Sequence, residues 1–149
     1  MANKNIDIAL FQPEIAGNVG SIIRSCACLN ANLHIIEPCG FPFDIKKIKK
    51  SALDYFDKIT IKRHNSFNIF YQNEVHDMSK RLILATTKGD QNLRKFTFKE
   101  NDIILFGQES CGVDLSIHQK CDHRVYIDMQ NNMRSINLAV SCGIFLSHI

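Results

Sequence analysis

The first segment with chemical potential in this 149-residue chain holds Asn18, Gly20 and Arg24 at the start of a helix-like stretch. Backbone amides at a helix N-terminus bind anions. A guanidinium six residues after Asn18 would lie at the polar edge of that helix, where it suits a phosphate. The alternative is an ordinary capped amphipathic helix with a surface arginine. The chain has no GxGxxG and no Walker A lysine, so the dinucleotide and nucleoside-triphosphate fingerprints are absent.

The second segment is the loop after the apolar run 102–106, where Glu109 stands between two glycines. Gly107 and Gly112 would permit close backbone approach or a positive φ. The alternative is a plain strand-to-helix turn with a solvated glutamate. This loop therefore indicates a ligand site only in combination with other segments.

The third segment is an asparagine-rich loop that leads into the last helical pattern of the chain. We expect Ser135 to cap that helix and Asn137 to lie in its first turn. The alternative is a capped terminal helix that only packs on the core. If the strands before the three segments are parallel neighbours, the segments meet beyond the carboxyl ends of the sheet, where open α/β sheets bind ligands.

The elements that must position these segments alternate between short apolar runs and helical patterns. Strands are expected at residues 6–11, 33–36, 58–62, 81–85, 102–106 and 124–127, and helices at 18–30, 45–53, 66–75, 114–118 and 135–147. Asn18, Asp44 and Ser66 are the expected N-caps of the first three helices. This alternation predicts an α/β domain with a largely parallel sheet.

Length and composition predict one globular domain. The chain is 45% hydrophobic and 22% charged, and it contains no apolar run of the roughly 18 residues that a membrane span needs. Its N-terminus lacks the apolar stretch of a secretory signal. Six cysteines occur without any C-x-x-C, which favours reduced thiols in a cytoplasmic protein over a disulfide framework or a zinc ribbon.

Basic residues gather in one part of the sequence. Residues 41–65 hold seven basic and three acidic side chains, whereas the whole chain has a net charge of only +3. Such a patch suits an anionic partner, and a solvated helix face is the alternative. The candidates for phosphate contact in this region are Lys46, Lys47, Lys49, Lys50 and Arg63.

Taken together, these segments resemble the SPOUT superfamily of RNA methyltransferases, and most closely the small TrmL-type enzymes that methylate the ribose 2′-oxygen at the tRNA wobble position. Family motifs are matched in order at residues 13–15 (P-E-I), 18–24 (N-x-G-x-I-x-R), 34–41 (H-I-I-E-P-x-G-F), 53–55 (L-D-Y), 86–89 (T-T-K-G), 106–112 (F-G-x-E-[ST]-x-G) and 127–138 (I-P-M…R-S-[LMI]-N-L). The likeness covers nearly the whole chain. It departs at Asp128, where the family has proline, and at Cys111, where a basic residue is common.

The resemblance implies a single SPOUT domain over residues 1–149: an α/β fold with a mostly parallel sheet, helices on both faces and a C-terminal trefoil knot that binds S-adenosylmethionine. It also implies a homodimer whose sites are completed across the interface, with a tRNA anticodon loop as partner and no membrane. The cofactor would be contacted by Ala85, Thr86, Gly107, Glu109, Gly112, Ile127, Met129, Ser135 and Ile136.

The implied reaction is attack of a ribose 2′-oxygen on the sulfonium methyl, without a metal. The family places the motif arginine, here Arg24, at this step. A guanidinium is too basic to accept the proton, so we expect it to hold phosphate and stabilise the developing alkoxide. Ser135 and Asn137 are expected to orient the ribose and the loop, and Asn18 and Arg24 to contact RNA. The alternatives are an RNA-binding protein with weakened catalysis, a 2′-O-methyltransferase for ribosomal RNA, and a small-molecule-binding α/β protein.

Overall fold

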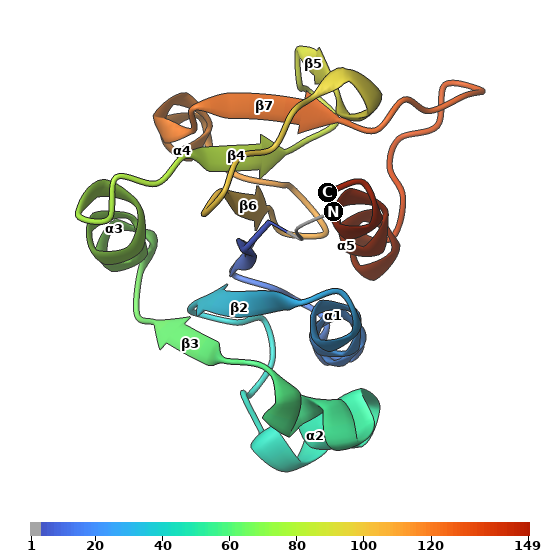
Figure 1. Ribbon diagram of the computed structural model, residues 1–149. Helices are drawn as coiled ribbons and strands as arrows, with labels where there is room; N and C mark the ends of the chain where they lie inside the picture. Colours follow the sequence, from blue (N-terminus) through green and yellow to red (C-terminus); the bar gives the residue numbers. More distant parts are fainter. Residues whose placement is uncertain (1–3) are drawn as a thin grey trace.

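The computed structural model describes residues 4–149, which form a seven-stranded parallel sheet with helices on both faces (Figure 1). Every neighbouring pair in the order β3-β2-β1-β6-β4-β7-β5 is parallel. The strands are β1 (Ile6–Phe11), β2 (Ala31–Ile36), β3 (Ile61–His64), β4 (Leu82–Ala85), β5 (Gln91–Asn92), β6 (Ile103–Phe106) and β7 (His123–Tyr126). The predicted α/β class, with a mostly parallel sheet and helices on both faces, is therefore confirmed.

The helices divide between the two faces of the sheet. They are α1 (Ala16–Cys28), α2 (Ile45–Ala52), α3 (Phe67–Phe70), α4 (Leu115–Lys120) and α5 (Leu138–Ser147), with 3-10 turns at Leu53–Lys58 and Leu93–Lys95 and a π-helical turn, η2, at Tyr71–His76. Buried side chains of α1, α2 and α5 share one core cluster, and those of α3 and α4 share the other. No helix among residues 4–149 is both long and apolar enough to cross a bilayer.

The two clusters follow from the alternation of side chains along each strand. On β1, Ile6, Ile8 and Leu10 enter the cluster under α1 and α5, while Ala9 and Phe11 enter the one under α3 and α4. Strands buried on both faces read as continuous apolar runs, which is typical of parallel sheets. That is why runs such as Ile103–Phe106 could be recognised in the sequence as strands.

Three of the wrongly predicted boundaries change the place of a named residue or a strand. Helix α1 begins at Ala16 after Ile15, so Asn18 is a buried residue of its first turn and not its N-cap. Helix α5 begins at Leu138, and Asn137 caps it by accepting bonds from the Ala139 and Val140 amides, whereas Ser135 lies in the preceding loop. The 3-10 turn after α2 shifts β3 to Ile61–His64.

The expected caps at Asp44 and Ser66 are confirmed. The Asp44 carboxylate accepts a bond from the Lys46 amide at 2.9 Å, and the Ser66 hydroxyl accepts one from the Ile69 amide at 3.2 Å. A short polar side chain that accepts from an amide two or three residues on is a local signal, so the sequence alone could reveal it.

Candidate functional site

A cleft of about 910 Å³ lies at the carboxyl ends of β4, β6 and β7, beside the start of α5. Parallel α/β sheets bind their ligands at this edge. The cleft is within the range of roughly 300–1,000 Å³ that is usual for small-molecule and cofactor sites. The predicted meeting of the three segments is confirmed, because Asn18, Glu109 and Ser135, one residue from each segment, all line this cleft.

All nine residues that the resemblance assigns to the cofactor line this cleft: Ala85, Thr86, Gly107, Glu109, Gly112, Ile127, Met129, Ser135 and Ile136. Asn18 and Asn137 line it as well. The lining combines apolar side chains with hydroxyl and amide groups. Such a mixture suits a ligand with an apolar ring and a polar sugar, so the residues present fit an adenosyl cofactor.

Glu109 joins the loop after β6 to the segment after β1. Its Oε2 accepts a hydrogen bond from the Glu14 amide at 2.8 Å, and its Oε1 accepts one from Nδ2 of Asn18 at 3.3 Å. Asn18 in turn accepts a bond through Oδ1 from Nδ2 of Asn137, at 3.3 Å. The chain Glu109–Asn18–Asn137 therefore ties together the three segments that the sequence singled out.

Glu14 completes this connection from the opposite direction. Its Oε1 accepts bonds from the amide and the hydroxyl of Ser110, at 2.8 and 2.7 Å. The bonds from the Ser110 amide and hydroxyl hold the pKa of the Glu14 carboxyl below its usual value. Each loop thus supplies a carboxylate to the backbone of the other, and sequence reasoning missed Glu14 although it lies within the P-E-I motif.

Two glycines allow the loop after β6 to close on itself. A Cβ at Gly107 would lie 2.5 Å from the carbonyl carbon of Gly112, and Gly112 has a φ of +67°. Gln108 and Gly112 exchange backbone hydrogen bonds at 3.0 and 2.9 Å. The predicted need for close approach and a positive φ is confirmed.

Several cleft residues were not predicted. Lys88, His118 and Arg134 all line the cleft, and Lys88 and Arg134 bring positive charge to it. Arg134 belongs to the R-S-I-N-L match, so its motif was the available signal. Lys88 belongs to T-T-K-G, and its amide donates to the Thr86 hydroxyl at 3.1 Å.

Arg24 is not among the residues that line the cleft. It is exposed on α1, as its position beside the apolar stripe predicts, and its guanidinium carbon lies 5.5 Å from the centroid of the Tyr55 ring. Within one chain the structure therefore separates this residue from Ser135 and Asn137.

The basic residues form an exposed surface on and beyond α2, also outside the cleft lining. Lys49 lies 3.8 Å from Asp57, in an exposed ion pair. Nη2 of Arg63 donates a hydrogen bond to Oε1 of Glu37 at 2.6 Å, and its guanidinium carbon lies 4.0 Å from the centroid of the Phe43 ring. Lys46, Lys47, Lys49 and Lys50 are all exposed on α2, so a role in RNA binding stays a prediction for this surface.

Similarity to known proteins agrees with this geometry. The chain is 40% identical over 139 residues to a tRNA (cytidine(34)-2'-O)-methyltransferase of Beijerinckia indica, which covers 93% of this chain and 86% of that protein. A structure described as "Structural insights into the 2-OH methylation of C/U34 on tRNA" superposes with a TM-score of 0.91 at 32% identity, over 98% of this chain and 94% of the other.

The same fold occurs in more distant proteins. The SpoU methyltransferase AviRb from Streptomyces viridochromogenes, solved in complex with AdoMet, superposes with a TM-score of 0.86 at 22% identity, over 99% of this chain and 57% of that one. Residues 5–147 match the SpoU rRNA Methylase family. The chain therefore belongs to the SpoU rRNA Methylase family.

Proposed function

We propose that this protein is an S-adenosylmethionine-dependent enzyme that methylates the ribose 2′-oxygen of the wobble nucleotide, cytidine or uridine, in tRNA. The observation that carries the proposal is the braced cleft at the ends of β4, β6 and β7, which all nine expected cofactor residues line. The names of the relatives at 32–40% identity support the choice of substrate.

The cofactor, when bound, supplies an electrophilic sulfonium methyl. The chain must then align the ribose and accommodate the charge that develops on its oxygen. Ser135 is exposed in the loop before α5 and lines the cleft, and we assign it to the ribose. Both ends of the Asn137 amide are engaged, by the start of α5 and by Asn18, so Asn137 acts as a positioning residue for the loop.

Arg24 is assigned to the substrate phosphate and the developing alkoxide, with the hydroxyl proton passing to phosphate or water. Because Arg24 lies outside the cleft of its own chain, this assignment requires a homodimer in which a second copy brings its Arg24 to the site. Exposed apolar side chains support such an interface: Val140 on α5 is 53% exposed, and Met133 in the loop before α5 is 64% exposed. We also propose the C-terminal trefoil knot. The strand order supports it, because β6 lies between β1 and β4 although it follows both of them in the sequence.

The RNA partner would be an anticodon loop, whose single-stranded riboses are accessible. The exposed lysines of α2 would contact its phosphates, so affinity should fall as salt rises. We further propose that one domain, residues 1–149, carries both the cofactor site and the RNA site and that it acts in the cytoplasm.

Nucleoside mass spectrometry of tRNA incubated with the protein and S-adenosylmethionine tests the proposal. The expected product is 2′-O-methylcytidine or 2′-O-methyluridine at the wobble position. Arg24→Ala should lower the rate by about 100- to 1,000-fold, with little change in cofactor Kd. Cofactor binding without methyl transfer to any RNA would instead indicate a protein with lost catalysis, and methylation of ribosomal RNA alone would favour the activity in the family's description.

A further inference from the structure

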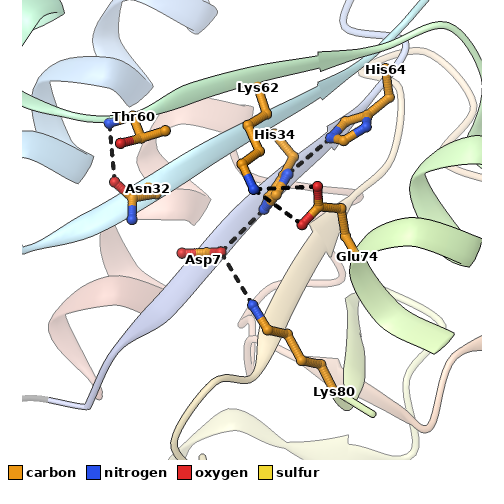
Figure 2. A network of polar contacts seen from close by, with 8 residues as sticks. All are labelled: Asp7, Asn32, His34, Thr60, Lys62, His64, Glu74 and Lys80. Atoms are coloured by element: carbon orange, nitrogen blue, oxygen red, sulfur yellow. Dashed lines mark hydrogen bonds and ion pairs between the residues drawn. The ribbon is translucent and has the colours of Figure 1, made fainter. Parts of the chain in front are cut away.

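Two buried histidines face each other across neighbouring strands (Figure 2). Both contact Phe70 of α3, and neither of them lines the cleft. His34 is 2% exposed and His64 is 7% exposed. Nδ1 of His34 lies 3.0 Å from Nε2 of His64. The Phe70 ring packs edge-on against both imidazoles, with centroid distances of 5.5 and 5.3 Å. Two nitrogen atoms able to bind a metal thus converge beside an aromatic side chain.

Strand register brings these side chains together. Ala9 pairs with His34, and Ile36 pairs with His64, so Asp7, His34 and His64 lie on a diagonal across β1, β2 and β3. Diagonal neighbours on one face of adjacent strands are within reach of long side chains. Glu74 reaches over the same point from η2, and one carboxylate oxygen of Glu74 and one ring nitrogen of each histidine lie within 4.8 Å of one another.

We propose that His34, His64 and Glu74 bind one Zn²⁺ ion, through Nδ1 of His34, Nε2 of His64 and the carboxylate of Glu74. Two imidazoles and one carboxylate are an established donor set for zinc, with a fourth position left for water. Two nitrogens on a tetrahedral zinc at about 2.0–2.1 Å are about 3.3 Å apart. The observed 3.0 Å therefore needs the two nitrogens to separate by about 0.3 Å and the rings to turn, so that both lone pairs point at the ion instead of along the shared hydrogen bond.

Asp7 occupies the outer position that zinc-binding histidines require. Nε2 of His34 and Oδ2 of Asp7 are 3.1 Å apart. A proton on Nε2 of His34, shared with this carboxylate, leaves Nδ1 as a free lone pair. His64 then donates from Nε2 in the metal-free protein. On binding zinc, that proton moves to Nδ1 of His64, so two neutral imidazoles become ligands without net proton release.

Lys62 is the group that the ion must displace. Its ammonium lies 3.4 Å from the Glu74 carboxylate, and the lysine side chain is 54% exposed. Solvent screens the lysine end of this pair, whereas the Glu74 side chain is only 14% exposed, so the ion takes over as the partner of the carboxylate when Lys62 leaves. Once Lys62 turns toward solvent, Glu74 can close on the ion, and the vacated space is the route of entry. The bound ion would join β2, β3 and η2, and methyl transfer would not depend on it.

Zinc titration of metal-free protein against a competing chelator, followed by X-ray absorption spectroscopy, tests the proposal. We expect one ion per chain, with nitrogen and oxygen ligands at about 2.0–2.1 Å and no sulfur at about 2.3 Å. His64→Gln and Glu74→Gln should weaken binding at least about 100-fold, and Asp7→Asn about 10- to 100-fold. His76→Gln is the matched control, because His76 lies on the same turn with a 67% exposed side chain, and its zinc affinity should equal that of the unchanged protein.

The change in Tm on adding zinc is a second measurement, and it can be compared across the unchanged protein and every folded variant. Zinc should raise the Tm of the unchanged protein and of His76→Gln, but not of the folded His64→Gln or Glu74→Gln. The proposal is wrong if no ion binds at micromolar zinc, if the spectrum shows sulfur ligands from cysteine, or if His64→Gln and Glu74→Gln bind zinc as tightly as His76→Gln does. None of these readouts involves methyl transfer, so they stand apart from a test of the proposed function.

Discussion

Replacing Glu109 with alanine should loosen the cleft. The Glu109 carboxylate accepts bonds from the Glu14 amide at 2.8 Å and from Nδ2 of Asn18 at 3.3 Å. Asn18 is only 8% exposed, so the substitution leaves its amide donor without this partner in a buried position. Losing a hydrogen bond to a charged group costs about 1.5–3 kcal/mol, and an unsatisfied buried donor costs about 1–3 kcal/mol. We expect the free energy that holds these loops in their observed conformation to fall by about 3 kcal/mol in total.

The same free energy should appear in the affinity for the cofactor, because the loops that Glu109 connects form the cleft walls. A loss of about 3 kcal/mol corresponds to a Kd roughly 100-fold larger, measured by isothermal titration calorimetry with S-adenosylhomocysteine. Glu109→Gln keeps the side-chain shape and one acceptor oxygen, so the S-adenosylhomocysteine Kd of this variant should lie between those of the unchanged protein and Glu109→Ala. Glu100→Ala is the matched control: Glu100 accepts one exposed bond from the Asn5 amide at 3.1 Å and should change Kd by less than about twofold.

A double variant separates bracing from direct contact with the ligand. If Glu109 acts through Asn18, then Glu109→Ala should cost about 1 kcal/mol less in an Asn18→Ala background than alone. An unchanged Kd for Glu109→Ala, or full additivity of the two substitutions, would refute the reasoning that this carboxylate holds the cleft in shape.

Three further substitutions or treatments test other parts of the structure. Gly107→Ala places a Cβ 2.5 Å from backbone, so the loop must shift; we expect cofactor Kd to rise more than about 10-fold by calorimetry, and unchanged affinity would contradict the tight loop. In the unchanged protein the Arg81 guanidinium donates two hydrogen bonds to the buried Asp102 carboxylate, at 2.6 and 2.8 Å, and Asp102→Asn removes that negative charge. We expect the free energy of unfolding, measured with urea, to fall by about 3 kcal/mol, and a loss under about 1 kcal/mol would show that the pair is dispensable. Burial raises the pKa of the Cys39 thiol to about 11, so iodoacetamide at pH 8 should modify the exposed Cys28 faster than Cys39, as followed by mass spectrometry; equal rates at Cys28 and Cys39 would contradict this difference in environment.

The sequence alone determined the elements and the loops that carry chemistry. Continuous apolar runs such as Ile103–Phe106 mark buried strands because both of their faces are covered, and polar residues follow where these strands end. Local caps at Asp44 and Ser66 were predicted correctly because each acts within three residues of itself. Motif order across the chain supplied the family, and with it the nine residues that line the cleft.

Tertiary structure decided how distant residues meet. The bond from the Glu14 amide to Glu109 spans 95 positions, and the bond between Asn18 and Asn137 spans 119. No local pattern encodes such contacts, because they depend on strand order and register, which pack the whole sheet at once. Asn18, expected as the N-cap of α1, is instead buried in the first turn of that helix. Asn137, expected in the first turn of α5, caps that helix in place of Ser135. The diagonal from Asp7 to His64 likewise exists only because three strands lie in one register.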